Sequence, residues 1–150
     1  MLLTITNIVS KKDIELKQER DRELYLTYLR GLREQHFDFT HEAADWARNQ
    51  PASRFYISSR ALVNYIGAMA HGSQPPAMFS QNRKKMKLLY DMYLEYMATT
   101  PDNKLSRERI CEMMVNQPAP MFYIGHDSAM KIILRERQRH LASLSRKEVR

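Results

Sequence analysis

One nine-residue segment occurs twice in this chain of 150 residues. Residues 49–57 read NQPASRFYI and residues 116–124 read NQPAPMFYI, so seven of nine positions are identical at an offset of 67. Upstream, LYLTYL at residues 24–29 corresponds to MYLEYM at residues 92–97, at an offset of 68. A match of this quality in so short a chain indicates a duplicated structural unit.

The chain is therefore expected to contain two copies of one unit within a single compact domain, 1–150. Unit one covers about residues 13–70 and unit two about residues 81–139. Residues 71–80 include Gly72 and two prolines, and we interpret them as a linker because this composition cannot be helical throughout. Residues 140–150 follow as a basic tail.

Each unit is predicted to begin with a long helix. Ser10 and Asp13 have the spacing of a capping box and can start the first one. A helical apolar stripe then follows, formed by Leu24, Tyr25, Tyr28 and Leu32. This helix should end near Gln35, and Ser80 should open its counterpart in unit two.

Two shorter helices complete each unit. Thr40 is a good N-cap for the second helix, and Pro51 stops it because the residue before a proline is pushed out of the helical region. Ser58 caps the third helix. In unit two, Ser106 opens the second helix and residues 125–127 open the third.

These patterns predict an all-α fold of two tandem repeats of a three-helix unit, packed around a pseudo-twofold axis. The link before each third helix contains Phe-Tyr-Ile, a β-prone run. Phe55–Ile57 and Phe122–Ile124 could pair across the axis as a minimal antiparallel two-stranded ribbon. The alternative is that each run packs into its own helical unit.

Composition excludes several classes of protein. No stretch approaches the roughly 18 apolar residues of a membrane span. The single cysteine, Cys111, excludes an internal disulfide framework, and the Gly-rich phosphate-binding motifs are absent. The lone thiol and the lack of a secretory signal favour a cytoplasmic location.

The sequence contains no pattern typical of catalysis. The five histidines lack the spacing of a metal site, and no H-E-x-x-H occurs. We expect Cys111 to be a buried inert thiol, since it lies on an apolar helix face beside Met113 and Met114. Tyr56 and Tyr123 lack the Arg/His set that a tyrosine nucleophile needs. We therefore expect no enzymatic activity, cofactor or metal.

The charge is basic and uneven. Lys and Arg number 24 against 17 Asp and Glu, giving a formal net charge of +7. Four of these cations fall within residues 83–87, at the start of a predicted helix where the dipole disfavours them. Seven more lie between Lys131 and Arg150, against two glutamates. Such clusters fit a phosphate footprint.

Two segments of unit one resemble the halves of a helix-turn-helix. Residues 40–44 (THEAA) would form its first helix and residues 58–66 (SSRALVNYI) its recognition helix, although nine residues replace the usual short turn. The duplicated NQPAxxFYI motif is also similar to segments of small basic proteins of bacterial mobile elements and phages. This resemblance implies no particular activity and favours a role with DNA.

We therefore hypothesise a small DNA-binding protein, regulatory or architectural, that contacts double-stranded DNA. Arg60 could bind a guanine edge and Asn64 an adenine edge. The full set of candidate residues is Arg54, Ser59, Arg60, Asn64, Arg83, Lys84, Lys85, Lys131, Arg135 and Arg139. Unit two places Asp127 near the start of its third helix, so the two units should not bind equivalent half-sites.

The rival hypothesis is a non-enzymatic protein-interaction or assembly module. It rests on the apolar segment Met1–Val9, which could bind a protein partner, and on the ten methionines, which suit adaptable protein contacts. One continuous positive face joining Arg60, residues 83–85 and residues 135–139 would favour DNA. Scattered cations beside an apolar groove would favour a protein partner.

Overall fold

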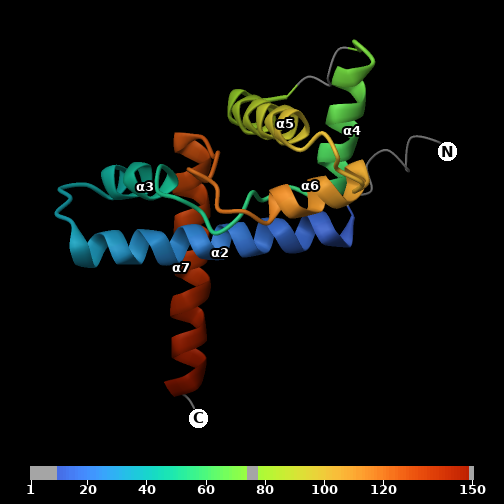
Figure 1. Ribbon diagram of the computed structural model, residues 1–150. Helices are drawn as coiled ribbons and strands as arrows, with labels where there is room; N and C mark the ends of the chain where they lie inside the picture. The colour runs from blue at the N-terminus through green and yellow to red at the C-terminus, as the bar shows by residue number, and fades with distance from the viewer. Residues whose placement is uncertain (1–9, 74–77, 149–150) are drawn as a thin grey trace.

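The computed structural model describes residues 10–73 and 78–148, and this part of the chain forms six helices and no strand (Figure 1). The all-α class expected from the sequence is confirmed. The helices are α2 (Lys11–Glu34), α3 (Thr40–Arg48), α4 (Ser59–Ala70), α5 (Ser80–Thr99), α6 (Arg107–Val115) and α7 (His126–Glu148). The apolar segment Met1–Val9 lies outside the described residues.

Three of the predicted helix starts have the expected caps. The side chains of Ser10, Ser58 and Ser106 each accept a hydrogen bond from the backbone N–H three residues later, at 3.1–3.2 Å. Ser80 opens α5 as expected, whereas the expectation that Thr40 is an N-cap was wrong by one residue. Both are the first helical residue, and the capping positions before them are phenylalanines without a side-chain cap bond.

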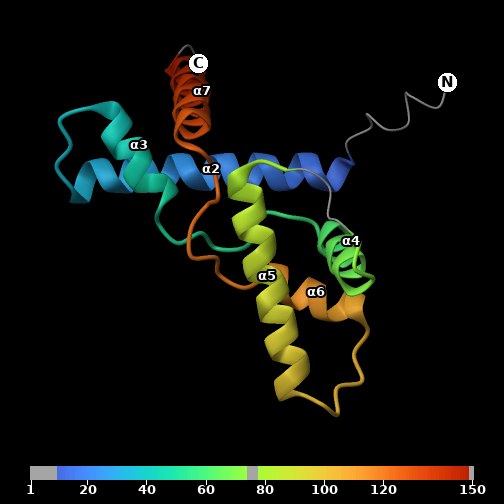
Figure 2. The same cartoon turned by 90° about the horizontal axis from the view of Figure 1, so that it is seen from above.

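The three helices of one sequence repeat do not form one bundle. Helix α2 packs against α3 and α7, whereas α4 packs against α5 and α6. The third helix of each repeat therefore lies in the bundle of the other repeat. In the view from above, α4, α5 and α6 form one group, and α3 and α7 lie around the other end of α2 (Figure 2).

Two extended links carry the third helices across the molecule, and they contact each other where they cross. Ala52 and Ala119 exchange backbone hydrogen bonds of 2.9 and 3.0 Å in an isolated antiparallel bridge. Phe55 N–H donates to the Val115 carbonyl at 3.0 Å, and Phe122 N–H donates to the Arg48 carbonyl at 3.1 Å. Each of these bonds has a counterpart 67 residues away in the sequence.

The ribbon expected from the Phe-Tyr-Ile runs does not form. Residues 55–57 and 122–124 carry no strand pairing, and the bridge lies three residues earlier, at the alanines. Tyr123 has a φ of 58°, which is outside the extended region that a strand requires. The alternative, in which each run packs into its own unit, is also wrong for the phenylalanines.

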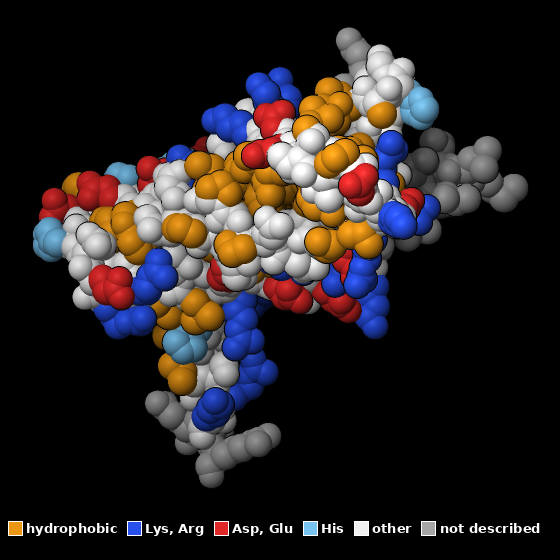
Figure 3. Space-filling model, in the orientation of Figure 1, with side chains coloured by type: hydrophobic (Ala, Val, Ile, Leu, Met, Phe, Trp, Pro, Cys, Tyr) orange, Lys and Arg blue, Asp and Glu red, His pale blue; other side chains and the backbone are white. Residues whose placement is uncertain are grey.

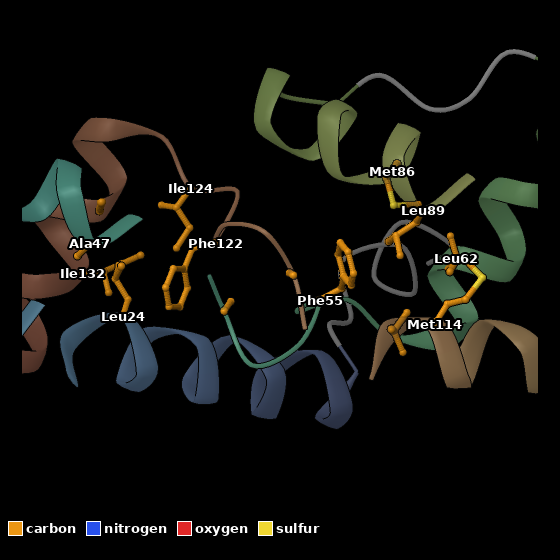
Figure 4. Close-up of a cluster of buried hydrophobic side chains, with 14 of the residues drawn as sticks. Leu24, Ala47, Phe55, Leu62, Met86, Leu89, Met114, Phe122, Ile124 and Ile132 are labelled. Atoms are coloured by element: carbon orange, nitrogen blue, oxygen red, sulfur yellow. The ribbon is translucent and has the colours of Figure 1, made fainter. Parts of the chain in front are cut away.

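Each phenylalanine of the duplicated motif packs into the bundle of the other repeat (Figure 4). Phe122 lies with Leu24 and Ala47, while Phe55 lies on the side of Leu62 and Met114. Phe55 is 1% exposed and Phe122 is 3% exposed. Burying a side chain of this size stabilises the fold by roughly 2–3 kcal/mol. The two rings thus fix both ends of the crossing.

One buried ion pair distinguishes the first bundle. Asp21 of α2 is almost fully buried, and its carboxylate accepts hydrogen bonds from Arg20 at 2.8 Å and from Arg135 of α7 at 2.6 Å. At the repeat offsets, Asp21 corresponds to Leu89 and Arg135 to Ala68. The second bundle thus places two apolar residues, Leu89 of α5 and Ala68 of α4, where the first bundle holds a charge pair.

This difference gives a stability test. Arg135→Ala should lower the free energy of unfolding by about 2 kcal/mol, because the buried carboxylate loses a charged partner. Asp21→Leu combined with Arg135→Ala should recover to within about 1 kcal/mol of the wild type, since apolar residues replace both charges. Urea unfolding measures both values. A double variant no more stable than Arg135→Ala would contradict this account.

A pair of helical glycines provides a second test. A Cβ on Gly31 of α2 would lie 2.7 Å from the Trp46 ring, whereas a Cβ on Gly67 of α4 would lie no closer than 3.6 Å to any atom. Gly31→Ala should destabilise the protein by about 1–2 kcal/mol through this overlap. Gly67→Ala should stabilise it by about 0.5–1 kcal/mol through helix propensity. Thermal unfolding of the two variants should shift in opposite directions.

Candidate nucleic-acid interface

Helix α7 is longer than the part of it that packs against α2 and α3 in the first bundle. Its 23 residues span about 34 Å. The first turns are buried against α2 and α3 through Ala129, Ile132 and Ile133. The second half projects beyond α2, on the side away from α5 (Figure 1). The segment expected as a basic tail from residue 140 is helical up to Glu148.

Four cations of α7 lie on one face of the helix, whereas Arg137, which is also exposed, lies on another face. Lys131, Arg135, Arg139 and Arg146 are exposed and spaced four, four and seven residues apart, which places them on one face of the helix. Figure 3 shows Lys and Arg side chains gathered along one side of this part of the molecule. Arg135 also holds Asp21, and Arg139 pairs with Glu136 at 3.0 Å.

The adjoining face of α7 carries exposed leucines. Leu134, Leu141 and Leu144 are 43%, 54% and 43% exposed. Their spacing of seven and three residues is that of a coiled-coil seam. The helix therefore presents a basic stripe and, beside it, a face of exposed leucines that Arg137 interrupts.

A cleft of about 380 Å³ lies in the corner between α2 and α7. Arg22 of α2 and Arg139 and His140 of α7 line it. The Tyr25 hydroxyl lies 3.1 Å from His140 Nδ1. Burial raises the pKa of Tyr25, and the nearby charge of Arg137 opposes that rise. The corner thus holds several donors suited to a phosphate, beside one carboxylate, Glu136.

Sequence reasoning missed this corner because its residues come from segments more than 100 positions apart. No motif joins Arg22 to His140. The basic run at the end of the chain indicated residues of α7 alone. Only the fold shows that α2 lies beside them.

The candidate residues of the first repeat lie elsewhere. Arg60 and Asn64, on the first turns of α4, line a cavity of about 450 Å³ together with Lys12 at the start of α2. Arg54 is half-buried and donates to the Phe55 carbonyl at 3.3 Å, and Ser59 is half-buried too. This group lies near the start of α2, away from the projecting half of α7 (Figure 1).

The cluster at residues 83–87 is divided by the fold. Arg83 and Lys84 are exposed on the first turn of α5, but Lys85 is 9% exposed. Lys85 is therefore mostly buried and is not part of the exposed basic surface of α5. The exposed cations thus form separate groups on α4, α5 and α7, instead of one continuous face.

The helix-turn-helix expectation within unit one was also wrong. Residues 40–44 lie in α3, which packs on α2 and α7, whereas residues 58–66 belong to α4, which packs on α5 and α6. The nine-residue link holds the two helices apart. The helices in contact are α3 with α7 and α6 with α4, so each contact joins one repeat to the other.

Lys85 has an unusual environment for a cation. Its ammonium donates to the Tyr56 carbonyl at 3.5 Å, a weak bond. Burial lowers the pKa of Lys85 to about 8, and the charge of Arg20 adds to this effect. Among the described residues it forms no ion pair. The group nevertheless remains mostly protonated at neutral pH.

The tyrosine considered as a nucleophile has a structural role. Tyr56 donates its hydroxyl proton to Glu23 of α2 at 2.5 Å, and Ser53 N–H donates to the same carboxylate at 2.8 Å. Burial, followed by this bond to Glu23, raises the pKa of Tyr56 to about 12. Glu23 thereby anchors the first link to α2. The phenol is held protonated, which disfavours nucleophilic attack.

Cys111 lies on the buried face of α6, as the sequence indicated. It is 0% exposed, and burial raises the pKa of its thiol to about 11. Within residues 10–73 and 78–148, no group of three or more His, Cys, Asp or Glu side chains is placed to hold a metal ion. Across the same residues, no helix combines the length and the apolar character that crossing a membrane requires.

The unusual pKa of Lys85 predicts a particular pH dependence of stability. The pKa is lowered from 10.5 to about 8, so between these values the unfolded chain binds more protons than the folded protein. The free energy of unfolding should therefore rise as pH increases through this window. Lys85→Met should raise stability at pH 7 by about 1–3 kcal/mol and remove its part of the rise. Lys84→Met is the matched exposed control, and equal pH profiles for both variants would contradict the assignment.

Comparisons with known proteins do not extend this description. No protein-family model, no curated protein and no solved structure matches the chain.

Proposed function

We propose that this protein binds double-stranded DNA, in a regulatory or architectural role, through helix α7. The observation that carries the proposal is the basic stripe along that helix, which begins at Lys131 on the packed half and continues to Arg146 on the projecting half. Lys131, Arg139 and Arg146 lie along one exposed face, with Glu136 as the neighbouring carboxylate. Cations in such a row match the spaced phosphates of a duplex, and their contacts release condensed counterions.

The shape of the region supports the same proposal. An α-helix that stands clear of its own bundle can enter a major groove, which is about 12 Å wide. The corner between α2 and α7 would then receive the adjacent backbone, with Arg22 and His140 as phosphate contacts. Phosphate contacts of this kind fix orientation, while base edges would be contacted from α7.

The proposal assigns DNA binding to one half of the molecule. We infer that the duplicated units pack around a pseudo-twofold axis at the Ala52–Ala119 bridge, which the offset-related hydrogen bonds support. At that offset, Lys131, Arg135 and Arg139 correspond to Asn64, Ala68 and Gly72. Because α4 lacks the stripe and ends at Ala70, the protein is expected to bind a single site rather than a palindrome.

Charge-matched variants test this proposal. Lys131→Gln, Arg139→Gln and Arg146→Gln together remove three charges from α7, and Arg83→Gln, Lys84→Gln and Lys87→Gln remove three from α5. Fluorescence anisotropy against a labelled duplex should show tight binding at low salt for the wild type. The α7 variant should lose most of that affinity and reduce the salt slope by roughly 3, since each phosphate contact contributes about 0.9.

The α5 variant is the control, and its affinity should stay within about threefold of the wild type, because exposed charges distant from the contact act only through screened fields. Equal losses in both variants would show nonspecific attraction to a basic protein and contradict an α7 site. Absence of binding by the wild type at low salt would overturn DNA binding altogether.

Two observations favour a second candidate function, protein interaction: the exposed cations form separate groups rather than one continuous face, and α7 carries exposed leucines. Leu134, Leu141 and Leu144 offer a helical partner an apolar seam. This candidate becomes the preferred one if the wild type fails to bind duplex DNA in the experiment above.

A further inference from the structure

A separate cavity of about 600 Å³ lies between α4 and α5. Its apolar lining comes from Ile57, Ala61, Met78 and Met86. Two asparagines, Asn64 and Asn82, and one cation, Lys85, supply its polar groups. Mostly apolar walls with a few converging polar groups, at a volume between about 300 and 1,000 Å³, are typical of small-molecule sites.

The ammonium of Lys85 has unused hydrogen-bonding capacity in this cavity. It carries three N–H donors, of which the structure employs one, weakly, toward the Tyr56 carbonyl at 3.5 Å. No described Asp or Glu forms an ion pair with it, and the stretches 1–9, 74–77 and 149–150 contain no Asp or Glu. The nearest charge that affects it is that of Arg20, which repels it.

Packing alone does not account for a lysine at this position. A buried charge without a partner destabilises the fold, and an apolar side chain of similar length would fill the space without that cost. The corresponding lysine of the other sequence repeat is not buried, so the repeat does not explain the burial of Lys85 either. At the offset of 68, Lys85 corresponds to Lys17, which is exposed on α2.

We propose that this cavity binds a small amphiphilic carboxylate, whose head group pairs with Lys85 and whose apolar body lies against Ile57, Met78 and Met86. A carboxylate supplies the negative charge that the described residues lack. Asn64 and Asn82 add amide donors near the same cavity. Methionine side chains adapt to an apolar chain of variable shape. The site is separate from the α2–α7 corner and does not depend on DNA binding.

Decanoate, used below its micellar concentration, is the probe, and decanol is the uncharged control of equal chain length. Isothermal titration calorimetry on the full chain should show saturable binding of one decanoate. Lys85→Met should weaken decanoate binding by about tenfold or more, because the head group loses its charged partner. Lys84→Met removes the neighbouring exposed charge and should change it by less than about twofold. Decanol should bind the wild type and Lys85→Met alike.

Two further measurements separate the site from general effects. Ala68 of α4 also lines the cavity, so Ala68→Phe fills it while keeping every charge and should abolish decanoate binding. The affinity of the wild type should fall above pH about 8, where Lys85 loses its proton, and that of Lys85→Met should not change. Circular dichroism confirms that each variant is folded.

The proposal is overturned if the wild type shows no saturable binding of decanoate. It is also overturned if several equivalents bind with the same affinity to the wild type, Lys85→Met and Ala68→Phe, since that is adsorption of an anion to a basic protein. Equal binding of decanoate by the wild type and Lys85→Met would remove the head-group contact on which the site rests.

Discussion

The crossing of the two extended links is the constraint on which the rest of this structure depends. Four backbone hydrogen bonds, centred on Ala52 and Ala119, hold the links where they pass each other. Beyond the crossing, Phe55 and Phe122 are each buried in the bundle opposite to their own repeat. Helices α4 and α7 come directly after these links in the chain, so each bundle is completed by a helix from the other half. Such an exchange couples the two halves, because neither has a closed core without the other.

The two bundles differ in what they present to solvent. Helix α4 has 12 residues and ends within its bundle, whereas α7 has 23 and projects from the molecule. The Asp21–Arg135 pair joins α7 to α2 at the point where the projection begins. Its counterpart positions in the second bundle are apolar, and in that bundle the cavity beside Lys85 lies between α4 and α5. The first bundle thus presents a basic helix to solvent, and the second contains Lys85 in a mostly apolar cavity.

Much of the local structure could be predicted from the sequence, because local signals determine it. The caps at Ser10, Ser58 and Ser106, the end of the first helix at Glu34 and the buried Cys111 all follow from short-range patterns. The exchange could not be predicted, since the apolar faces of α4 and α7 fit a bundle of the same kind in either half. Lys85 lies in a run of cations, a pattern typical of a solvent-exposed segment. Its burial depends on how α4 and α5 pack around the cavity between them. Arg135 meets Asp21 across 114 residues, a pairing that no local pattern shows.

The exchange of helices is tested most directly by nuclear Overhauser effects between assigned aromatic side chains. The ring centroids of Tyr25 on α2 and His140 on α7 are 5.9 Å apart. Those of His41 on α3 and His126 on α7 are 6.2 Å apart. Cross-peaks for both pairs, together with cross-peaks between Tyr65 of α4 and Tyr90 of α5, are the result that the exchanged structure predicts. Cross-peaks joining α4 to α2 or α3, and α7 to α5 or α6, would show that each repeat closes on itself and would contradict the exchange.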